Sequence, residues 1–388
     1  MLKRYFSGLT KNTFLLACAS LFSDISTEML YPILPVYLTQ VLKANGSIVG
    51  IVEGVATATQ NIAQGYSGWL SDKLRKRKPI ALFGYTLSAI SKPFIGIVSS
   101  WEGVLGARFL DRLGTGIRSS PRDALIASSV DGNNRGKAFG LEGIGDNLGA
   151  FIGPLIAVFL LFFLHVEMRS IFYLAIIPGL LAIGMIVLVT EKQGAVKARV
   201  KLDISFKKFP KVYWNYLLVT ALFSIGNSSN AFLILQTRAL GVSLEGTIIV
   251  YAIFNLVAAL ISYPSGFLSD TFGRKQVLLG SFVIFLITYI GFAITNSILV
   301  IIVLFALYGV FQGTFRTVGK AYASDFVPHN LYSSSIGWYS TVIGLMGIVS
   351  SVVAGGLWDT VGHSAVFVYG ALFAGIGSLA LIFLVPKK

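Results

Sequence analysis

The pentapeptide Gly68-Trp-Leu-Ser-Asp72 returns almost unchanged as Gly266-Phe-Leu-Ser-Asp270 in the second half of the chain (270 − 72 = 198 residues later). The same offset places Arg118 opposite Arg316. An offset shared by two separate places is hard to obtain by chance. The sequence therefore predicts two related halves, each carrying one copy of the pentapeptide.

The composition indicates a membrane protein. Of 388 residues, 55% are hydrophobic and only 12% are charged, and the mean hydropathy is +0.76. Soluble domains average about 25% charged residues. Apolar runs near the roughly 20 residues that a helix needs to cross a bilayer recur throughout. These runs are too long and continuous for barrel strands, so we expect an all-α integral membrane protein.

Twelve runs are long enough to be membrane-spanning helices, in two pseudo-symmetric bundles of six. We expect an N-terminal bundle over 1–190, a cytoplasmic linker over 191–211 and a C-terminal bundle over 212–388. Part of the linker, Val200–Phe206, has the pattern of an interfacial helix. The predicted spans are 12–40, 46–70, 79–100, 102–126, 138–164, 169–190, 212–237, 244–269, 275–295, 298–324, 333–357 and 363–385.

The distribution of basic residues predicts the orientation. The connections on the opposite side hold little beyond Lys43 and Arg169. Because cytoplasmic loops carry the excess of Lys and Arg, we expect both termini in the cytoplasm and a multi-pass protein of the inner (cytoplasmic) membrane. The basic clusters lie at Lys3/Arg4, Lys73–Lys78, Arg135/Lys137, Lys192–Lys211, Arg274/Lys275 and Lys387/Lys388.

Composition also excludes several classes. The net charge of +14 gathers in these loops, so topology explains it better than a nucleic-acid partner does. The single Cys18 cannot form an intramolecular disulfide, and His165, His329 and His363 are too far apart in sequence to suggest a metal site. With no Ser-His-Asp spacing either, we expect no catalytic residues, no metal and no cofactor. The expected partners are a small-molecule substrate, protons and the lipid bilayer, with the chain acting as a monomer.

Several motifs resemble those of the major facilitator superfamily, along essentially the whole chain. The first pentapeptide, followed by Arg75 and Arg77, is similar to the family's signature between helices 2 and 3. The second copy, followed by Gly273-Arg274-Lys275, is the closer match, because the first has Leu74-Arg75 where a glycine is usual. The resemblance implies the twelve-helix fold of secondary transporters, which move substrates by alternating access.

Three further stretches resemble motifs of this superfamily, and two of them resemble those of its antiporters. Arg108–Gly116 is similar to the fourth-helix motif, with Asp111 and Arg112 in place of Gln and Gly. Gly149–Pro154 resembles the fifth-helix antiporter motif without its closing glycine pair, and Asp24–Pro35 resembles helix 1 of drug–proton antiporters. The resemblance therefore favours the proton-coupled drug and metabolite antiporter branch.

The repeated pentapeptides predict a gate. Gly68 and Gly266 lack side chains and so permit close helix approach. Asp72 and Asp270 would end a helix, where a carboxylate can accept hydrogen bonds from an arginine or a helix N-terminus and latch one transport state. The alternative, a solvated loop that only sets topology, is favoured for Lys73 and Lys76. The predicted gating residues are Gly68, Asp72, Arg75, Arg77, Arg122, Asp123, Gly266, Asp270 and Arg274.

Charged residues inside spans are functional candidates because each costs about 2.5–3.5 kcal/mol to insert. Asp24 and Glu28 are four residues apart, so they lie on one face of the first helix. Such carboxyls can bind and release protons. Alternatively, one of them permanently neutralises an arginine of the fourth helix. Coupling is favoured for Asp24, and both alternatives stay open for Glu28.

The fourth helix carries six charges from Arg108 to Asp123. At about 100° per residue they fall within a wedge of about 140°, which must face the protein interior. We expect Arg108, Asp111 and Arg112 near Asp24. Glu142 and Asp146, again four residues apart, are expected to neutralise Arg118 or Arg122. The predicted proton-coupling residues are Asp24, Glu28, Asp111 and Arg112, and the predicted substrate-cavity residues are Arg108, Arg118, Arg316, Glu142 and Asp146.

These residues favour proton-coupled efflux of a small molecule by a secondary active transporter. The alternative is uptake or exchange of an anionic metabolite or metal chelate, clamped by Arg112, Arg118 and Arg316, since guanidinium groups bind carboxylates and phosphates bidentately. Arginines that lack carboxylate partners favour the anion alternative, and arginines fully paired with carboxylates disfavour it. A membrane enzyme is the weakest of the three classes.

Overall fold

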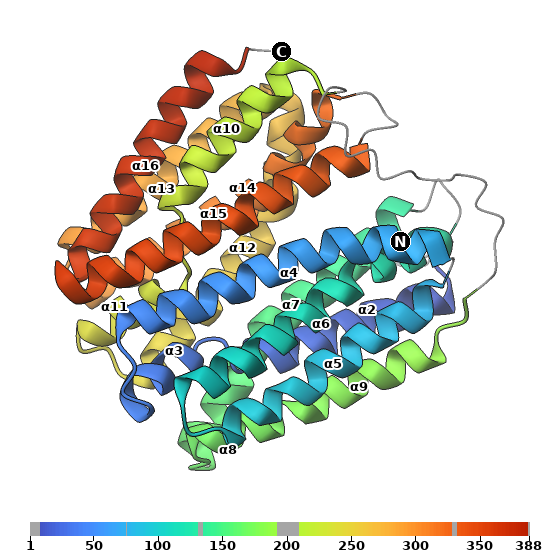
Figure 1. The fold of residues 1–388 in the computed structure, drawn as a ribbon, viewed down its shortest axis with the longest axis horizontal. Helices are drawn as coiled ribbons and strands as arrows, with labels where there is room; N and C mark the ends of the chain where they lie inside the picture. The colour runs from blue at the N-terminus through green and yellow to red at the C-terminus, as the bar shows by residue number, and fades with distance from the viewer. Residues whose placement is uncertain (1–7, 75, 131–134, 192–208, 328–331, 387–388) are drawn as a thin grey trace. The chain divides into compact units, whose positions relative to one another are not determined.

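The computed structural model describes residues 8–74, 76–130, 135–191, 209–327 and 332–386, and within these ranges the regular elements are helices (Figure 1). Most of the predicted linker, including the interfacial helix proposed for 200–206, lies outside the described residues, as does Arg75. The residues group into two compact units. The first holds Met1–Ile33 and Thr59–Leu202, and the second holds Leu34–Ala58 and Asp203–Lys388. The division at 190 and 212 stays a prediction.

The first unit packs helices from the N-terminal half. Helix α5 lies against α6 and α9, and α2 lies against α7 and α9 (Figure 1). Its apolar core joins side chains of all five of these helices, among them Leu16, Ala81, Ile126 and Ile186. The elements are α2 (Lys11–Glu28), the later turns of α4 (Gly46–Leu74), α5 (Arg77–Ile97), α6 (Trp101–Ser128), α7 (Arg135–Val158), the π-helix η3 (Phe159–Phe163), α8 (Met168–Leu174) and α9 (Ile176–Leu188).

Glycines bring α7 unusually close to α2. A Cβ added at Gly149 would lie 2.8 Å from the Asp24 Cβ, and one at Gly153 would lie 2.8 Å from the Met29 backbone nitrogen. Gly145, one turn earlier, meets the Ala17 carbonyl. The resulting small-residue stripe, spaced every four residues, is typical of close helix pairs in membranes. The antiporter-like segment Gly149–Pro154 therefore forms the face of α7 that contacts α2.

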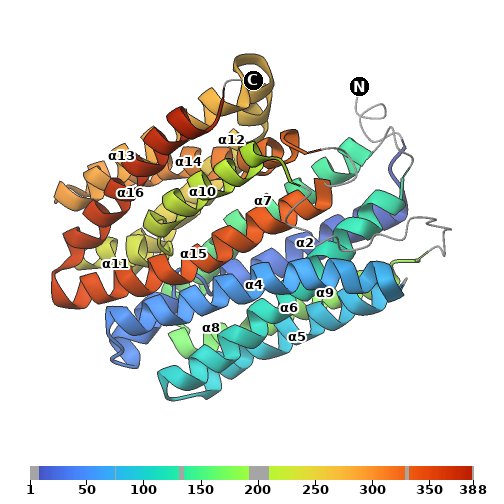
Figure 2. The same cartoon turned by 45° about the horizontal axis from the view of Figure 1, so that its top comes forward.

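The second unit is built around aromatic rings. Phe223 on α10 is fully buried and stacks on Phe282 of α13, with ring centroids 3.9 Å apart. Helix α13 lies beside α16, as both views show (Figures 1 and 2). The elements are α3 (Leu34–Val36), the π-helix η1 (Tyr37–Val41), the first turns of α4, α10 (Lys211–Gly226), α11 (Ala231–Ala239), α12 (Leu244–Phe272), α13 (Arg274–Ile294), α14 (Ile298–Asp325), α15 (Tyr332–Thr360) and α16 (His363–Leu384).

Nine helices among the described residues are long and apolar enough to cross a membrane. The other three predicted spans differ in recognisable ways. The first, expected as one helix over 12–40, breaks after Glu28 and resumes at Leu34, where Pro32 and Pro35 lack the backbone N–H that a helix interior uses. The second and fourth, α4 and α6, have spanning length at 29 and 28 residues but contain more polar residues.

Both pentapeptides are helical, and their helices run past the predicted ends of the second and eighth spans. Helix α4 continues to Leu74 and α12 to Phe272, beyond the expected ends at 70 and 269. Glycine and serine do not end a helix when the backbone hydrogen bonds continue, so each motif forms the last turns of its helix. Gly273, with φ of +95°, ends α12 in a conformation that favours glycine.

Candidate functional site: a buried charge network in the first unit

Helix α6 turns its charged wedge into the first unit, as the projection predicted. Arg108, Asp111 and Arg118 are 1%, 0% and 3% exposed, whereas Phe109 and Leu110 on the other face are 41% and 40% exposed. The hydroxyl of Ser100 caps the N-terminus by accepting from the Gly103 N–H. The helix runs past Pro121 to Ser128, so all six charges belong to one continuous helix.

Glycines pack α6 against its neighbours and fix the direction of the wedge. A Cβ at Gly114 would lie 2.6 Å from the Gly84 carbonyl and the Ser88 nitrogen of α5. A Cβ at Gly116 would lie 2.5 Å from the Gln60 carbonyl of α4. Helix α6 is therefore held between α4 and α5 at near-backbone contact.

Asp111 is the centre of the first group of charges, which we call the Asp111 cluster (Ser88, Lys92, Arg108, Asp111 and Arg112). Its carboxylate accepts from Ser88 Oγ at 2.7 Å and from Arg108 Nη1 at 3.1 Å. Lys92 Nζ lies 3.5 Å from Asp111 Oδ1, and Arg112 Nε lies 3.8 Å from Oδ2. One buried carboxylate is thus shared by three cations.

Lys92 is a buried charge that the sequence analysis missed. Its side chain is 1% exposed on α5, and its ammonium also donates to Ser88 Oγ at 3.2 Å. The available signal was a lysine directly before Pro93 inside an otherwise apolar span. The prediction of Asp111 and Arg112 as a proton-coupling pair did not include this third partner, and their proposed role stays a prediction.

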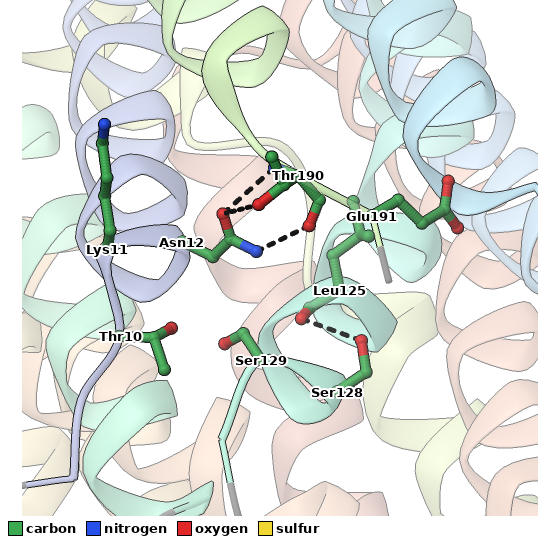
Figure 3. A pocket seen from close by; sticks show the side chains of 8 residues that line it. All are labelled: Thr10, Lys11, Asn12, Leu125, Ser128, Ser129, Thr190 and Glu191. Carbon is green, nitrogen blue, oxygen red and sulfur yellow. Dashed lines mark hydrogen bonds between the residues drawn. The ribbon is translucent and has the colours of Figure 1, made fainter. Parts of the chain in front are cut away.

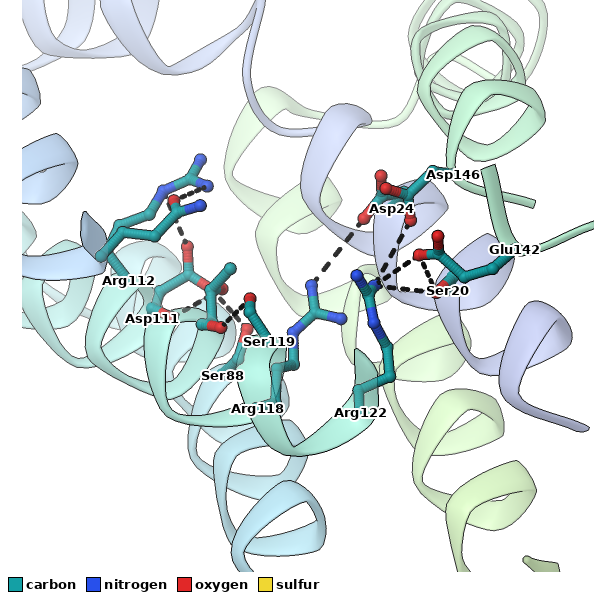
Figure 4. A network of polar contacts seen from close by, with 12 residues as sticks. Ser20, Asp24, Ser88, Asp111, Arg112, Arg118, Ser119, Arg122, Glu142 and Asp146 are labelled. Carbon is teal, nitrogen blue, oxygen red and sulfur yellow. Dashed lines mark hydrogen bonds and ion pairs between the residues drawn. The ribbon is translucent and has the colours of Figure 1, made fainter. Parts of the chain in front are cut away.

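Arg122 is the centre of a second group, the Arg122 cluster (Ser20, Arg122, Asp123, Glu142 and Asp146). Its guanidinium lies 2.9 Å from Glu142, 3.0 Å from Asp123 and 3.5 Å from Asp146. It also donates to Ser20 Oγ at 2.9 Å, and that hydroxyl donates to Glu142 at 3.0 Å (Figure 4). Glu142 and Asp146 therefore neutralise Arg122, one of the two partners expected for them.

Arg118 lies between the two clusters and forms a long ion pair with Asp24 (Figure 4). Its Nη2 is 3.8 Å from Asp24 Oδ1, beyond hydrogen-bond distance, and the Asp24 side chain is 26% exposed. The guanidinium stacks over the Tyr85 ring at 4.5 Å. Among the described residues, Arg118 Nε and Nη1 have no hydrogen-bond partner although they are buried.

The partner of Asp24 differs from the expected one. Sequence analysis placed Asp24 near Arg108, Asp111 and Arg112, but the structure pairs it with Arg118. The glycine contact between α7 and α2 at Gly149 positions Asp24, and no sequence spacing within α2 or α6 reveals that contact. Glu28 is the last residue of α2 and is half-buried.

Two basic residues of the predicted gate, Arg77 and Arg274, bind near helix C-termini within their own units. Arg77 Nη1 donates to the Ala124 carbonyl at 3.5 Å, and Arg274 Nη1 donates to the Ala321 carbonyl at 2.5 Å and to Asp325 at 2.8 Å. Both arginines reach 47 residues ahead, so the pseudo-symmetry extends to these contacts. Unpaired carbonyls at a helix C-terminus attract cations. The arginines therefore also have a structural role that the gating prediction did not include.

The two glycines of the predicted gate differ. A Cβ at Gly68 would meet the Ser120 Cβ at 3.1 Å, which is a close approach. At Gly266 the nearest atom, of Thr317, would be 3.6 Å away, an ordinary contact, so the expected close approach is wrong there. The side chains of Asp72 and Asp270 lie outside the described residues, and their latch stays a prediction.

Arg316 belongs to the other unit. It lies on α14 in the second unit, and its side chain is exposed. Its sequence counterpart Arg118 is buried in the first unit. A clamp that includes both arginines stays a prediction.

A polar pocket of about 180 Å³ lies at the ends of α2, α6 and α9, away from these clusters (Figure 3). Asn12 closes one side through three hydrogen bonds to Thr190, of 2.7, 3.1 and 3.1 Å. Glu191 also accepts from the backbone N–H groups of Arg77 and Lys78, which caps α5. Because Asn12 and Glu191 already bind other residues of the protein, the polar groups of this pocket connect helix ends to one another.

Long apolar helices around a buried charge network are typical of a polytopic membrane protein. Comparison with known proteins identifies its family. The family model described as Major Facilitator Superfamily matches residues 16–234 and 216–388, and the chain belongs to this superfamily. Its members are transporters, not enzymes.

Relatives and solved structures agree with this assignment. The chain is 34% identical to an uncharacterised transporter of the superfamily from Methanocaldococcus jannaschii, over 97% of this chain and 95% of that one. It is 29% identical to the quinolone resistance protein NorA of Staphylococcus aureus, over 52% of each chain. The crystal structure of a mutant of the nucleoside transporter NupG has the same fold, with a TM-score of 0.79 at 14% identity, covering 97% of this chain and 99% of that one.

Proposed function

We propose that the protein is a proton-coupled secondary transporter that exports a small molecule, with Asp24 as the proton-binding residue. The supporting observation is the contrast among the buried ion pairs. Asp111 has three cationic neighbours and Arg122 has three anionic ones, whereas Asp24 lies 3.8 Å from Arg118 and is partly exposed. A pair that exchanges during each cycle must be reachable and weakly held, and Asp24–Arg118 fits both conditions.

Proton binding at Asp24 removes the charge that faces Arg118. The carboxyl and the guanidinium then separate without leaving an unpaired carboxylate in the membrane, which would be costly. When Asp24 gives up its proton, the ion pair forms again. A substrate that competes with the proton for Asp24 would leave as the proton enters, which is antiport.

Two observations favour efflux. The glycine face of α7 that carries the antiporter-like motif directly contacts Asp24. Arg122 faces three carboxylates, and such full pairing disfavours its use in an anion clamp. The similarity to a quinolone resistance protein is consistent with export. We place the protein in the cytoplasmic membrane, as a monomer with both termini inside.

Proton-driven counterflow in proteoliposomes tests this function. With ethidium and norfloxacin as probes and pyranine reporting internal pH, an imposed pH step should drive probe movement coupled to protons. Asp24→Asn should abolish the coupled movement. Glu102→Gln, which removes an exposed carboxylate from the first turn of α6, is the matched control and should transport normally. Accumulation of probe against its gradient by Asp24→Asn would refute the coupling assignment.

A second candidate, transport of an anion, is favoured by Arg118 alone. A guanidinium can bind a carboxylate bidentately through two edges, Nε with Nη2 and Nη1 with Nη2. In Arg118, Nη2 faces Asp24. The other two nitrogens have no hydrogen-bond partner among the described residues. A carboxylate could therefore bind by displacing Asp24. Arg118→Lys keeps the charge but removes the bidentate edge. If the protein transports an anion through Arg118, Arg118→Lys should lose benzoate counterflow and keep ethidium transport. Arg316→Lys should then keep both activities.

A further inference from the structure

Helix α4 begins directly against the end of α15, in the second unit. The Asp359 carboxylate accepts from the backbone N–H of Gly46 at 2.8 Å, from the N–H of Ser47 at 2.8 Å and from Ser47 Oγ at 2.5 Å. These residues are more than 300 positions apart in the sequence. One side chain of α15 thus binds three donors at the start of α4.

The N-terminus of α4 has a special need for this carboxylate. The first N–H groups of a helix have no partner within it and carry partial positive charge. Asn45 Oδ1 satisfies one of them by accepting from Ile48 N–H at 3.0 Å. Asp359 supplies the acceptors for the two preceding N–H groups, with a charge of the favourable sign.

Below this cap, a row of glycines brings the two helices together. Gly46, Gly50 and Gly54 are spaced every four residues and face α15. A Cβ at Gly46 would lie 2.6 Å from the Trp358 ring, one at Gly50 would meet the Ser351 carbonyl, and one at Gly54 would lie 3.2 Å from the Ile348 Cα. The shape of the contact comes from the glycines, and its charge comes from Asp359.

Trp358 fixes the position of the neighbouring aspartate. Its ring stacks on His363 at 3.8 Å and lies 5.8 Å from the buried ring of Phe232. Asp359 is therefore carried on a helix end that is held by aromatic contacts from α11 and α16. The Asp359 carboxylate is therefore held in place on α15. Its hydrogen bonds to Gly46 and Ser47 break only when α4 moves away from α15.

We propose that Asp359 is a latch that holds α4 against α15 and so closes this end of the protein in one transport state. The bonded groups of the Asp359 latch, a carboxylate and two helix N–H groups, can each bind water after separation, so the contact can break and reform. The start of α4 is opposite to the end that carries Asp72, and positive-inside topology places it outside the cell. The latch would therefore close the outer face.

Cysteine accessibility tests the latch. Ser351 is 3% exposed and lies beneath Gly50, so Ser351→Cys in a Cys18→Ala background reports whether the helices separate. Labelling by a membrane-impermeant maleimide would be measured on right-side-out vesicles. Asp359→Asn and Asp359→Ala should label about 2- to 5-fold faster than the parent, the range expected for losing a charge at a helix terminus. Glu245→Gln, in the first turn of α12, is the matched control and should not change the rate.

The outcomes separate a latch from a simple helix cap. If Asp359 only stabilises the fold, its variants lower the melting temperature but label at the parental rate, and the proposal is overturned. Should Asp359→Ala fail to fold, Asp359→Asn and Ser47→Ala, which removes only the hydroxyl donor, decide the question. The measurement uses neither substrate nor proton gradient, so its result is independent of the proposed proton-coupled efflux.

Discussion

The two units have different interiors although their sequences share a repeat. The first buries the Asp111 and Arg122 clusters, whereas the second buries stacked rings around Phe223. Arg118 of the first unit is 3% exposed, and its counterpart Arg316 is exposed. A duplicated framework has therefore diverged into a unit stabilised by paired charges and a unit stabilised by packing. In the first unit, we propose that the long Asp24–Arg118 pair, with its partly exposed carboxylate, is the one that exchanges protons.

Removing Asp111 should destabilise the first unit more than any other change proposed here. Asp111→Ala leaves three cations facing one another in a buried site, and breaking a buried pair costs about 3–5 kcal/mol. We expect a large loss of folded protein, measured by thermal unfolding of purified protein in detergent. The double variant Asp111→Asn/Lys92→Met removes one carboxylate charge and one cation and should be more stable than Asp111→Asn alone. Equal stability of the two would contradict the charge account.

Phe223 tests the packing of the second unit. Its ring has 0% exposure and lies within 5.6 Å, between centroids, of Phe282, Phe285, Phe311 and Phe315. Phe223→Ala should lower the free energy of unfolding by about 3 kcal/mol because it leaves a cavity. Phe383→Ala, at a position that is 79% exposed, should have little effect in the same unfolding assay. If the two substitutions are equally destabilising, the ring cluster does not stabilise the second unit.

Gly149 connects the packing of the first unit to its charges. The added methyl of Gly149→Ala would lie 2.8 Å from the Asp24 Cβ, so α2 and α7 must separate, at a cost of about 1–3 kcal/mol. Proton-coupled transport should fall more than the amount of folded protein does, because Asp24 moves relative to Arg118. Gly143→Ala is the matched control on the same helix, since nothing lies within 4 Å of its added methyl. Unchanged coupling in Gly149→Ala would remove the link between this glycine and the site.

Much of the architecture was predictable because it follows from one-dimensional patterns. Apolar runs of spanning length predicted the helices, and the wedge of charges from Arg108 to Asp123 predicted which face of α6 is buried. The ends of α4 and α12 were placed several residues too early, because nothing in the local sequence stops these helices at 70 and 269. Lys92 was missed because a single lysine in an apolar span forms no pattern.

The amino-acid sequence by itself determined the membrane class, the duplicated halves and the superfamily, since these depend on composition, run length and a repeated motif. Only the tertiary structure decided which ion pairs form. Asp24 meets Arg118 because glycines of α7 bring α2 close, and Asp359 meets the start of α4 because glycines bring α4 close to α15. Whether two charged groups pair depends on the distance between helices that are far apart in the chain. Glycines set that distance, because they let the backbones of those helices approach closely.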